Sequence, residues 1–270
     1  MKNSKTWISQ VIQMLGPHKT STEIPDKIAY SRDMWPKALL WQRKGDYPFH
    51  PDLVVWPENE DEVCKILEFC HSHEIPIVPW GGGSGVCGGA IPVRGGLVMD
   101  LKRMNKILHI DRKSLLVRSQ TGIMGEILER SLNQEGLTLG HFPSSIYCST
   151  LGGWLATRAA GQLSSLYGKI EDMVSSLRIA LPSGRILETP SGPKSSTGPD
   201  FNQLFLGTEG TLGIFTQAEL KVHPLPEHRA FLSGTFSNLE NGLEGIRLLM
   251  QNGLRPAALR LYDGLDTLLA

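Results

Sequence analysis

A glycine-rich stretch at residues 79–90, PWGGGSGVCGGA, constrains the fold more than any other feature, because six of its residues are glycine. Glycine has no Cβ and tolerates positive φ, so successive backbone N–H groups can turn toward one point and form an anion-binding nest. A flexible glycine-rich turn is the competing interpretation, and the stretch alone does not decide between the two. The choice therefore depends on the rest of the chain.

The same stretch contains the dinucleotide-binding string G-x-G-x-x-G at Gly83, Gly85 and Gly88. Asp100 follows as a candidate ribose ligand. That motif works only where the glycines lead into a helix whose N-terminus holds the pyrophosphate. Residues 89–96 contain a proline and further glycines, so they cannot form such a helix, and no Gly-Lys-Ser/Thr follows to make a P-loop. The glycines are therefore expected to join two strands without a crossover helix.

Composition limits the classes of function. The 270 residues hold 27 Lys and Arg against 27 Asp and Glu, so no net charge draws the chain to nucleic acid or anionic lipid. The N-terminal residues contain no unbroken apolar run, which argues against a secretory signal or a membrane span. The four cysteines are scattered, which favours a reducing compartment and argues against a metal site. We expect a cytoplasmic protein, with peripheral contact to a membrane left open.

Apolar periodicity predicts an α+β fold. Asn59 is expected to cap the helix that follows it, with Glu62 three residues later. A Pro-Ser-Gly turn at residues 182–184 predicts a hairpin. The expected strands are residues 53–56, 75–79, 97–100, 115–120, 176–180, 185–187, 214–222, 230–236 and 257–262, and the expected helices begin near residues 7, 59, 124 and 239.

The elements group into three parts. Residues 1–46 are expected to form an N-terminal extension, a helix followed by irregular chain. Residues 47–226 are expected to form the main sheet-rich domain, in which Lys194 is an ordinary surface charge. Residues 227–270 predict one β-α-β unit, too small to stand alone. Because that unit ends inside an apolar run, we expect it to begin a further C-terminal domain.

Two other segments share the character of the first loop. Residues 149–161 read STLGGWLATRAAG, and residues 207–215 read GTEGTLGIF and lead directly into a predicted strand. Small residues let two backbones, or a backbone and a flat ligand, approach closely. Three such segments, each beside a strand end and rich in hydroxyls, predict one extended ligand lying across all of them.

The chain thus carries an ordered series of motifs: PWGGGSG (79–85), SSIYCST (144–150), TLGGWLATRAAG (150–161), LYGKIEDMV (166–174), STGPD (196–200) and GTEGTLGIF (207–215). This series resembles the FAD-binding domain of the vanillyl-alcohol oxidase and p-cresol methylhydroxylase superfamily, the FAD-linked oxidases. Within it the chain is most similar to the alkyldihydroxyacetonephosphate synthase branch. The glycolate oxidase and D-lactate dehydrogenase branch shares the glycine loops.

The resemblance implies a two-subdomain PCMH-type α+β fold, with a small β-α-β sheet, a larger mixed or antiparallel sheet with flanking helices, and the start of a cap domain. It also implies FAD as the cofactor. The first loop would surround the pyrophosphate. Residues 144–150, with residues 156–159, would line the ribityl and isoalloxazine. Residues 209–215 would lie beside the adenine and ribose or under the flavin. The cofactor-binding residues that it implies are Pro79, Trp80, Gly81, Gly82, Gly83, Ser84, Gly85, Ser144, Ser145, Ile146, Tyr147, Cys148, Ser149, Thr150, Gly152, Gly153, Ala156, Thr157, Arg158, Ala159, Glu209, Gly210, Thr211, Leu212, Gly213, Ile214 and Phe215.

The mode of flavin attachment follows from departures within these motifs. Some family members attach the flavin through a histidine in the first loop, where this chain has Ser84. Certain oxidases carry a second, cysteinyl link near the position of Cys148. Because the loop histidine is missing and a buried thiol is usually inert, noncovalent FAD is expected.

His141 and Arg158 are the candidate catalytic residues. An imidazole transfers protons near neutrality, and a guanidinium can hold a carboxylate or phosphate or offset charge on the flavin. A hydrogen-bonded structural histidine is the competing interpretation for His141. For Arg158 it is an ion pair with Glu171 or Asp172.

The resemblance implies that the chain is the FAD-binding portion of an FAD-dependent oxidoreductase. The flavin N5 would take hydride from, or form an adduct with, a small oxygenated substrate such as a 2-hydroxy acid. Three alternatives stay open: redox-neutral ether-lipid synthesis by an alkyldihydroxyacetonephosphate synthase, a non-catalytic flavin-binding module, and a domain whose glycine loops are only structural. The catalytic base is expected beyond residue 270, and a second copy or an electron acceptor is a candidate partner.

Overall fold

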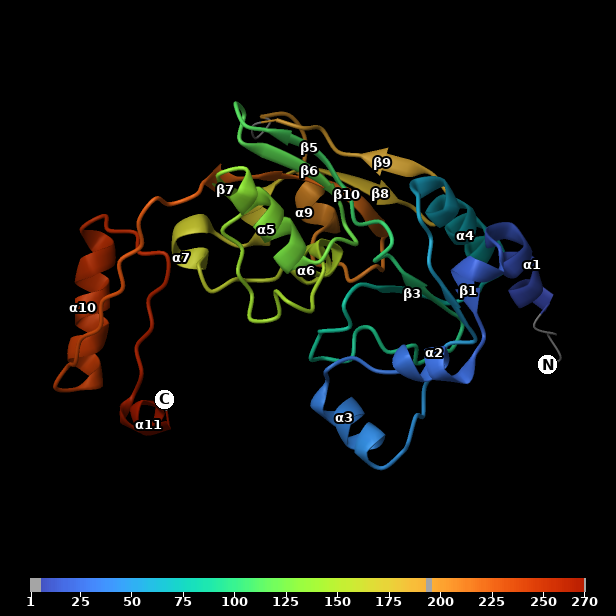
Figure 1. Ribbon diagram of the computed structural model, residues 1–270, viewed down its shortest axis with the longest axis horizontal. Coiled ribbons are helices and arrows are strands. Elements are labelled where there is room, and N and C mark those ends of the chain that lie inside the picture. The colour runs from blue at the N-terminus through green and yellow to red at the C-terminus, as the bar shows by residue number, and fades with distance from the viewer. Residues whose placement is uncertain (1–5, 193–195, 270) are drawn as a thin grey trace.

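The computed structural model describes residues 6–192 and 196–269 of the 270-residue chain. Two main sheets with their helices form the body, and a helical C-terminal unit lies apart from both (left in Figure 1). This is the two-sheet α+β arrangement that the sequence predicts. Lys194, expected to be a surface charge, lies outside the described residues.

The smaller sheet has three parallel strands and one antiparallel edge strand. Its parallel strands are mostly apolar runs, and Leu53, Val55 and Val98 are fully buried. The helix between the first two parallel strands begins as predicted, because the Asn59 side chain accepts a hydrogen bond from the Glu62 N–H at 2.9 Å. In spatial order the strands are β1 (Thr20–Ser21), β2 (Leu53–Val55), β4 (Leu97–Asp100) and β3 (Ile77–Trp80); the helix is α4 (Glu60–Ser72), which buries Val63, Ile66, Leu67 and Cys70.

The glycine loop is itself the crossover between β3 and β4. The two strands are parallel neighbours, yet no helix connects them. Such a pair needs a connection of about a dozen residues or more, which residues 81–96 provide. The predicted strand–loop–strand connection is therefore confirmed, and the loop leaves the carboxyl end of β3, the edge where open parallel sheets bind ligands.

The larger sheet has five antiparallel strands and carries the larger core on its inner face. Ala218 and Leu220 of its longest strand are buried, as their alternation predicts. The strands in spatial order are β5 (Ile107–Asp111), β6 (Leu116–Gln120), β10 (Ile214–Lys221), β8 (Val174–Ala180) and β9 (Ile186–Glu188). A two-stranded sheet of β7 (Leu137–Thr138) and β11 (His223–Pro224) and the helices α5 (Gly125–Gln134), α6 (Leu151–Thr157), α7 (Ser164–Tyr167), α8 (Ile170–Met173) and α9 (Phe201–Phe205) complete this part.

The N-terminal extension is more regular than predicted. Its first helix buries Val11 and Leu15 as expected, but the next residues, expected to be irregular, form further helices and the edge strand β1. Pro25 and Pro36 lie in the first turns of two of these helices, where the missing N–H would have no partner in any case. The helices are α1 (Thr6–Leu15), η1 (Pro17–Lys19), α2 (Ile24–Ala29) and α3 (Pro36–Arg43).

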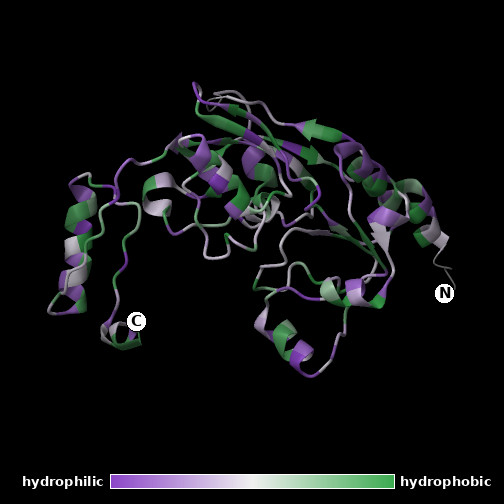
Figure 2. Ribbon diagram, viewed as in Figure 1, coloured by the Kyte–Doolittle hydropathy of each residue, from purple (hydrophilic) through white to green (hydrophobic). Residues whose placement is uncertain are grey.

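The C-terminal unit lacks the two strands predicted for it. Residues 230–236 and 257–262 pair with no strand in the described part of the chain. Phe231 and Leu232 are 89% and 98% exposed, so their apolar pattern has no neighbouring sheet to pack against. Figure 2 shows hydrophobic residues along this separate unit. The predicted helix is present as α10 (Leu239–Gln251) and is followed by α11 (Gly264–Leu269).

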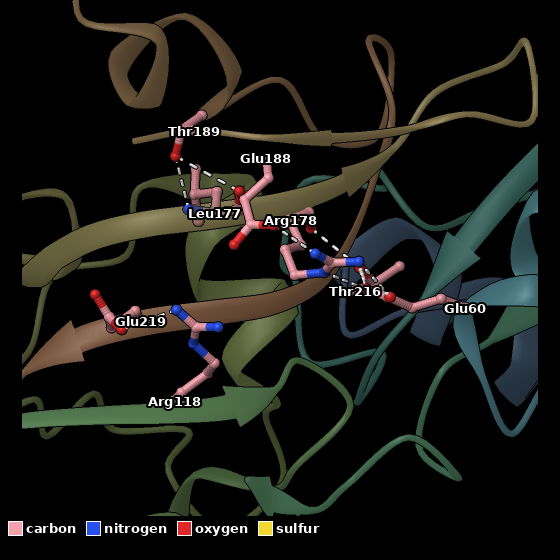
Figure 3. Close-up of polar contacts among 8 residues, drawn as sticks. All are labelled: Glu60, Arg118, Leu177, Arg178, Glu188, Thr189, Thr216 and Glu219. Atoms are coloured by element: carbon pink, nitrogen blue, oxygen red, sulfur yellow. Dashed lines mark hydrogen bonds and ion pairs between the residues drawn. The ribbon is translucent and has the colours of Figure 1, made fainter. Parts of the chain in front are cut away.

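A network of ion pairs joins the larger sheet to α4, the helix of the smaller sheet (Figure 3). Arg178 in β8 donates to both carboxylate oxygens of Glu60 in α4, at 3.1 and 2.9 Å, and to Glu188 in β9 at 2.5 Å. The Thr216 hydroxyl donates to Glu60 at 2.6 Å. Burial alone would raise the pKa of Glu60, but the hydrogen bonds from Arg178 and Thr216 more than offset it and lower the pKa. The charged carboxylate therefore links α4 to the larger sheet.

Replacing Glu60 with glutamine is expected to lower the free energy of unfolding by about 1–2 kcal/mol, because it leaves Arg178 without a mostly buried charge partner. Since the pKa of Glu60 is lowered on folding, its contribution is present above pH 4.5 and is lost as the pH falls below that value. Urea unfolding at neutral pH measures the change. Glu244→Gln, in the exposed α10, is the matched control and should have no effect; an equal loss in both variants would contradict the link.

Candidate functional site

The first loop (residues 79–90) packs directly on the second segment (residues 144–161). A methyl group at Gly81 would lie 2.2 Å from Thr150 Oγ1, and one at Gly82 would lie 1.9 Å from the Cys148 carbonyl oxygen. Side-chain atoms do not approach so closely, so only glycine allows this contact. These glycines therefore allow, first of all, the close approach of another protein segment.

The third loop (residues 207–215) joins the same cluster. A methyl group at Gly89 would lie 2.4 Å from Glu209 Oε2, and one at Gly210, where φ is +83°, would lie 2.5 Å from Pro79 Cγ. The Glu209 N–H donates to the Ala156 carbonyl of the second segment at 3.1 Å. The structure thus brings the three predicted segments together at the carboxyl end of β3.

The first loop offers a set of free backbone donors. None of the N–H groups of residues 82–90 donates a hydrogen bond to a described residue. Gly83 and Gly88 have φ of +62° and +83°, the left-handed conformation that turns successive N–H groups toward one side. A diphosphate accepts several such bonds, so the donor set fits the pyrophosphate of a dinucleotide.

Several hydroxyls that were expected to face a ligand are used within the protein. Ser149 Oγ donates to the Ser145 carbonyl at 2.7 Å and accepts from the Trp154 indole N–H at 2.8 Å. Thr150 Oγ1 accepts from the Gly153 N–H at 3.3 Å and caps α6. These bonds hold residues 144–150 against α6, and the exposed residues of the second segment remain available to contact a ligand.

The other predicted residues differ in exposure. Ile146, Ile214 and Phe215 belong to the hydrophobic cores, so they support the loops from beneath. Among all predicted residues, the exposed ones are Gly85, Ser144, Tyr147, Cys148, Thr157, Glu209, Thr211 and Leu212; the partly buried ones are Pro79, Gly81, Gly82, Gly83, Ser84, Ser145, Gly152, Gly153, Ala156, Arg158, Ala159 and Gly210; and the buried ones are Trp80, Ile146, Ser149, Thr150, Gly213, Ile214 and Phe215.

His141 is buried at the base of the second segment. It is 1% exposed, and its ring meets the Trp154 ring edge-on at 4.6 Å between centroids. Burial lowers its pKa to about 4, with nearby Glu171 acting in the opposite direction. Neither ring nitrogen has a hydrogen-bond partner among the described residues, so the expected hydrogen-bonded structural histidine is not what the structure shows. A neutral imidazole here has one donor and one acceptor to offer.

Arg158 acts within the protein as a clamp. It lies at the C-terminus of α6 in the left-handed conformation, with φ of 50°. Its guanidinium donates to the carbonyls of Leu206 at 3.1 Å and Gln203 at 2.8 Å, at the end of α9. The expected pairing with Glu171 is present at 3.9 Å. Arg158 therefore positions the third loop.

Three residues that hold the first loop could not be predicted from local sequence patterns. Lys102 Nζ donates to the Gly81 carbonyl at 2.9 Å and to Asp100 Oδ2 at 2.7 Å. Tyr30, 70 residues before Asp100, donates to the same carboxylate oxygen at 2.5 Å. Asp33 lies against Gly85. Such contacts join segments far apart in the chain, and no local motif marks them. Asp100 is 1% exposed and its carboxylate is bonded to Tyr30 and Lys102, which agrees with its rejection as a ribose ligand.

The cysteines differ from expectation in one respect. Cys148 is exposed, as is Cys87 in the first loop, so the burial assumed for Cys148 was wrong. The expectation that Cys148 forms no covalent link to the flavin therefore rests only on the absence of the loop histidine.

No cluster of His, Cys, Asp and Glu in the described residues is placed to hold a metal ion. Among the helices of those residues, none combines the length and apolar character that a membrane crossing requires.

Comparison with known proteins agrees with this geometry. The family model described as "FAD binding domain" matches residues 51–190. Alkyldihydroxyacetonephosphate synthase of Caenorhabditis elegans is 44% identical over 225 residues, covering 82% of this chain and 38% of that protein. Glycolate oxidase subunit GlcD of Bacillus subtilis (strain 168) is 35% identical over 255 residues, covering 94% and 52%. The mitochondrial D-lactate dehydrogenase [cytochrome] of Arabidopsis thaliana is 33% identical over 216 residues, covering 79% and 37%.

Solved structures show the same relationship. A structure of alkyldihydroxyacetonephosphate synthase superposes with a TM-score of 0.88 at 33% identity, over 99% of this chain and 50% of that one. p-Cresol methylhydroxylase with substrate bound superposes with a TM-score of 0.69 at 20% identity, over 83% and 44%, which shows the fold alone. The chain spans about half the length of the relatives that it matches or less.

Proposed function

The chain belongs to the FAD-binding domain family of the FAD-linked oxidases, and we propose that it forms the flavin-holding part of an FAD-dependent enzyme with FAD bound noncovalently across its three loops. The observation that carries this proposal is the convergence of the loops at the carboxyl end of β3, with the N–H groups of residues 82–90 free to bind an anion. A plain glycine-rich turn would not require close packing against two distant segments.

Each segment has a proposed role. The N–H groups of the first loop bind the pyrophosphate. Exposed residues of the second segment, among them Ser144, Tyr147 and Cys148, line the ribityl and isoalloxazine, and the third loop closes the adenine and ribose side. Arg158 keeps the third loop in place through the carbonyls of Leu206 and Gln203. The buried Ile146, Ile214 and Phe215 act only as support.

His141 is 1% exposed, so it does not contact a substrate directly, and we propose it as a buried support of the second segment. Because burial keeps it neutral near pH 7, one ring nitrogen can donate a hydrogen bond and the other can accept one. When bound, FAD supplies the hydride-accepting or adduct-forming chemistry. The chain provides anion binding, orientation and the buried imidazole; further acid–base groups are expected beyond residue 270.

The reaction that we propose is oxidation of a small oxygenated substrate, with a 2-hydroxy acid as the substrate class. Relatives named glycolate oxidase subunit and D-lactate dehydrogenase support it. Alkyldihydroxyacetonephosphate synthesis is a second candidate, favoured by the 44% identity to the Caenorhabditis elegans enzyme. The first reaction leaves the flavin reduced after one turnover, whereas the second involves no net redox change.

Anaerobic mixing separates these activities. In the complete gene product loaded with FAD, glycolate or D-lactate is expected to bleach the visible flavin band. Exchange of the acyl group of acyl-dihydroxyacetone phosphate for a long-chain alcohol, with no bleaching by 2-hydroxy acids, would contradict the first proposal and support the second. Failure of both reactions in a yellow, folded protein would point to a non-catalytic flavin-binding module.

We also propose the division of the chain into an N-terminal extension (1–46), an FAD-binding domain (47–226) and the start of a cap domain (227–270). Exposed apolar residues of the C-terminal unit, such as Phe231 and Leu232, support its packing against further protein. The free thiols support a reducing, cytoplasmic location. A second copy or an electron acceptor is the proposed partner, which sedimentation with and without substrate would detect.

A further inference from the structure

The segment of residues 30–35 touches the first loop, although it lies outside the region matched by the family model. The Met34 N–H donates to the Gly85 carbonyl at 2.9 Å. A methyl group at Gly88 would lie 3.1 Å from the Trp35 ring, which packs against the far end of the loop. In Figure 1 this segment runs between α2 and α3, next to the loop that follows β3. The N-terminal extension therefore reaches the anion-binding loop directly.

Tyr30 secures the near end of the loop through a relay of side chains. Its hydroxyl donates to Asp100 Oδ2 at 2.5 Å and accepts from the Trp56 indole N–H at 2.9 Å. Burial and the Asp100 carboxylate raise the pKa of Tyr30, so the phenol stays protonated and keeps donating. Asp100 in turn fixes Lys102, whose ammonium group donates to the Gly81 carbonyl at 2.9 Å. A charge-assisted chain thus leads from Tyr30 to Gly81.

Asp33 lies at the middle of the loop. It is 1% exposed, and its Oδ1 accepts from the Trp35 N–H at 2.9 Å, which fixes the turn of the segment. Its Oδ2 is buried and has no donor among the described residues. A methyl group at Gly85 would lie 3.6 Å from that oxygen, so the unpaired acceptor faces the loop whose N–H groups are free. A buried carboxylate oxygen without a donor is unfavourable, so Asp33 Oδ2 has the capacity to accept a hydrogen bond from the adjacent loop.

We propose that residues 30–35 act as a strap that holds the first loop in its pyrophosphate-binding arrangement, with Tyr30 and Asp33 as positioning residues. The strap fixes the loop at Gly81 and Gly85, so less conformational freedom is lost when the anion binds. Asp33 Oδ2 is the acceptor that lies against the loop at Gly85. This inference rests on the proposed FAD site.

Two conservative variants test the strap. Tyr30→Phe removes one hydroxyl, and Asp33→Asn removes one charge while keeping a carbonyl oxygen for the Trp35 N–H. Each is expected to weaken FAD and ADP binding about tenfold, the size expected for one charge-assisted hydrogen bond. Riboflavin, which has no pyrophosphate, is expected to bind as in the wild type. Flavin fluorescence measures FAD and riboflavin, and displacement of FAD measures ADP.

Tyr262→Phe, at a half-exposed position in the C-terminal unit, is the matched control and should bind all three compounds as the wild type does. Wild-type affinity of both strap variants for FAD and ADP would overturn the proposal. An equal loss of riboflavin binding would also overturn it, because it would show general damage, which the urea midpoint of the ligand-free variant would register. A wild-type chain that binds no FAD would instead sink the proposed function and the strap with it.

Discussion

Replacing Gly82 with alanine is expected to weaken FAD binding at least about 100-fold, equivalent to about 3 kcal/mol. The added methyl group would lie 1.9 Å from the Cys148 carbonyl oxygen and 2.9 Å from its carbonyl carbon. Both are backbone atoms, which cannot swing aside as a side chain would. The first loop must therefore move away from the second segment, and the N–H groups lose their common direction. Titration with FAD, followed by flavin fluorescence, measures the effect.

Gly234→Ala, in the C-terminal unit, is the matched control. No atom lies within 4 Å of the position of its methyl group. We expect its FAD affinity to stay within about twofold of the wild type. Equal affinities for the Gly82 and Gly234 variants would show that contact between the loop and Cys148 is not needed for the site. Urea unfolding without FAD shows whether either variant is folded.

The chain is expected to lose about 2 kcal/mol of stability because of His141 when the pH falls from about 7.5 to about 5. The folded-state pKa of about 4 lies below the unfolded value of 6.5, because burial excludes the charged imidazolium. The unfolded chain therefore takes up the proton first. The contribution of His141 is complete above pH 6.5 and is lost as the pH falls from there toward 4.

His141→Phe is the variant that isolates this effect, because it keeps an aromatic ring against Trp154 and cannot titrate. Its stability should fall less steeply between about pH 7.5 and about pH 5 than that of the wild type. Some slope remains, since burial also lowers the pKa of His223. The exposed His71→Gln variant is the control and should keep the wild-type slope. Identical slopes for the wild type and His141→Phe would contradict the assignment.

Local patterns predicted most of the main body. The continuous apolar runs of β2 and β4, the Asn59 cap and the alternation along β10 depend on neighbouring residues, and all are present. The absence of a helix after Gly88 also followed from local chemistry, since a proline and several glycines exclude one. The absence of that helix excluded a Rossmann unit and indicated that the loop itself connects the two strands.

The reason for the glycines was only partly visible in the sequence. The glycine pattern predicted that another group lies close to the loop backbone, and we expected that group to be a ligand. The structure shows that Cys148, Thr150 and Glu209 occupy the spaces that side chains at Gly82, Gly81 and Gly89 would need. Contacts between distant segments leave no spacing rule in the sequence. The same holds for the hydroxyl of Ser149, which is taken by Trp154.

Two errors have a common cause. The strands predicted at residues 230–236 and 257–262 have the right alternation but no sheet to join, because strands are stable only beside partners. The part of the extension after its first helix was expected to be irregular, yet β1 pairs with β2, and residues 30–35 contact the first loop. In both places tertiary contacts decide the structure, and a single sequence does not contain them explicitly.

The visible absorption spectrum of the purified chain, after incubation with FAD and gel filtration, tests the central claim most directly. We predict a flavin spectrum that travels with the protein, and yellow colour that passes into the supernatant on acid precipitation, because FAD is held noncovalently across the three loops. Colour retained in the pellet would contradict noncovalent binding and point to Cys148. A folded chain that remains colourless would contradict the proposed FAD site itself.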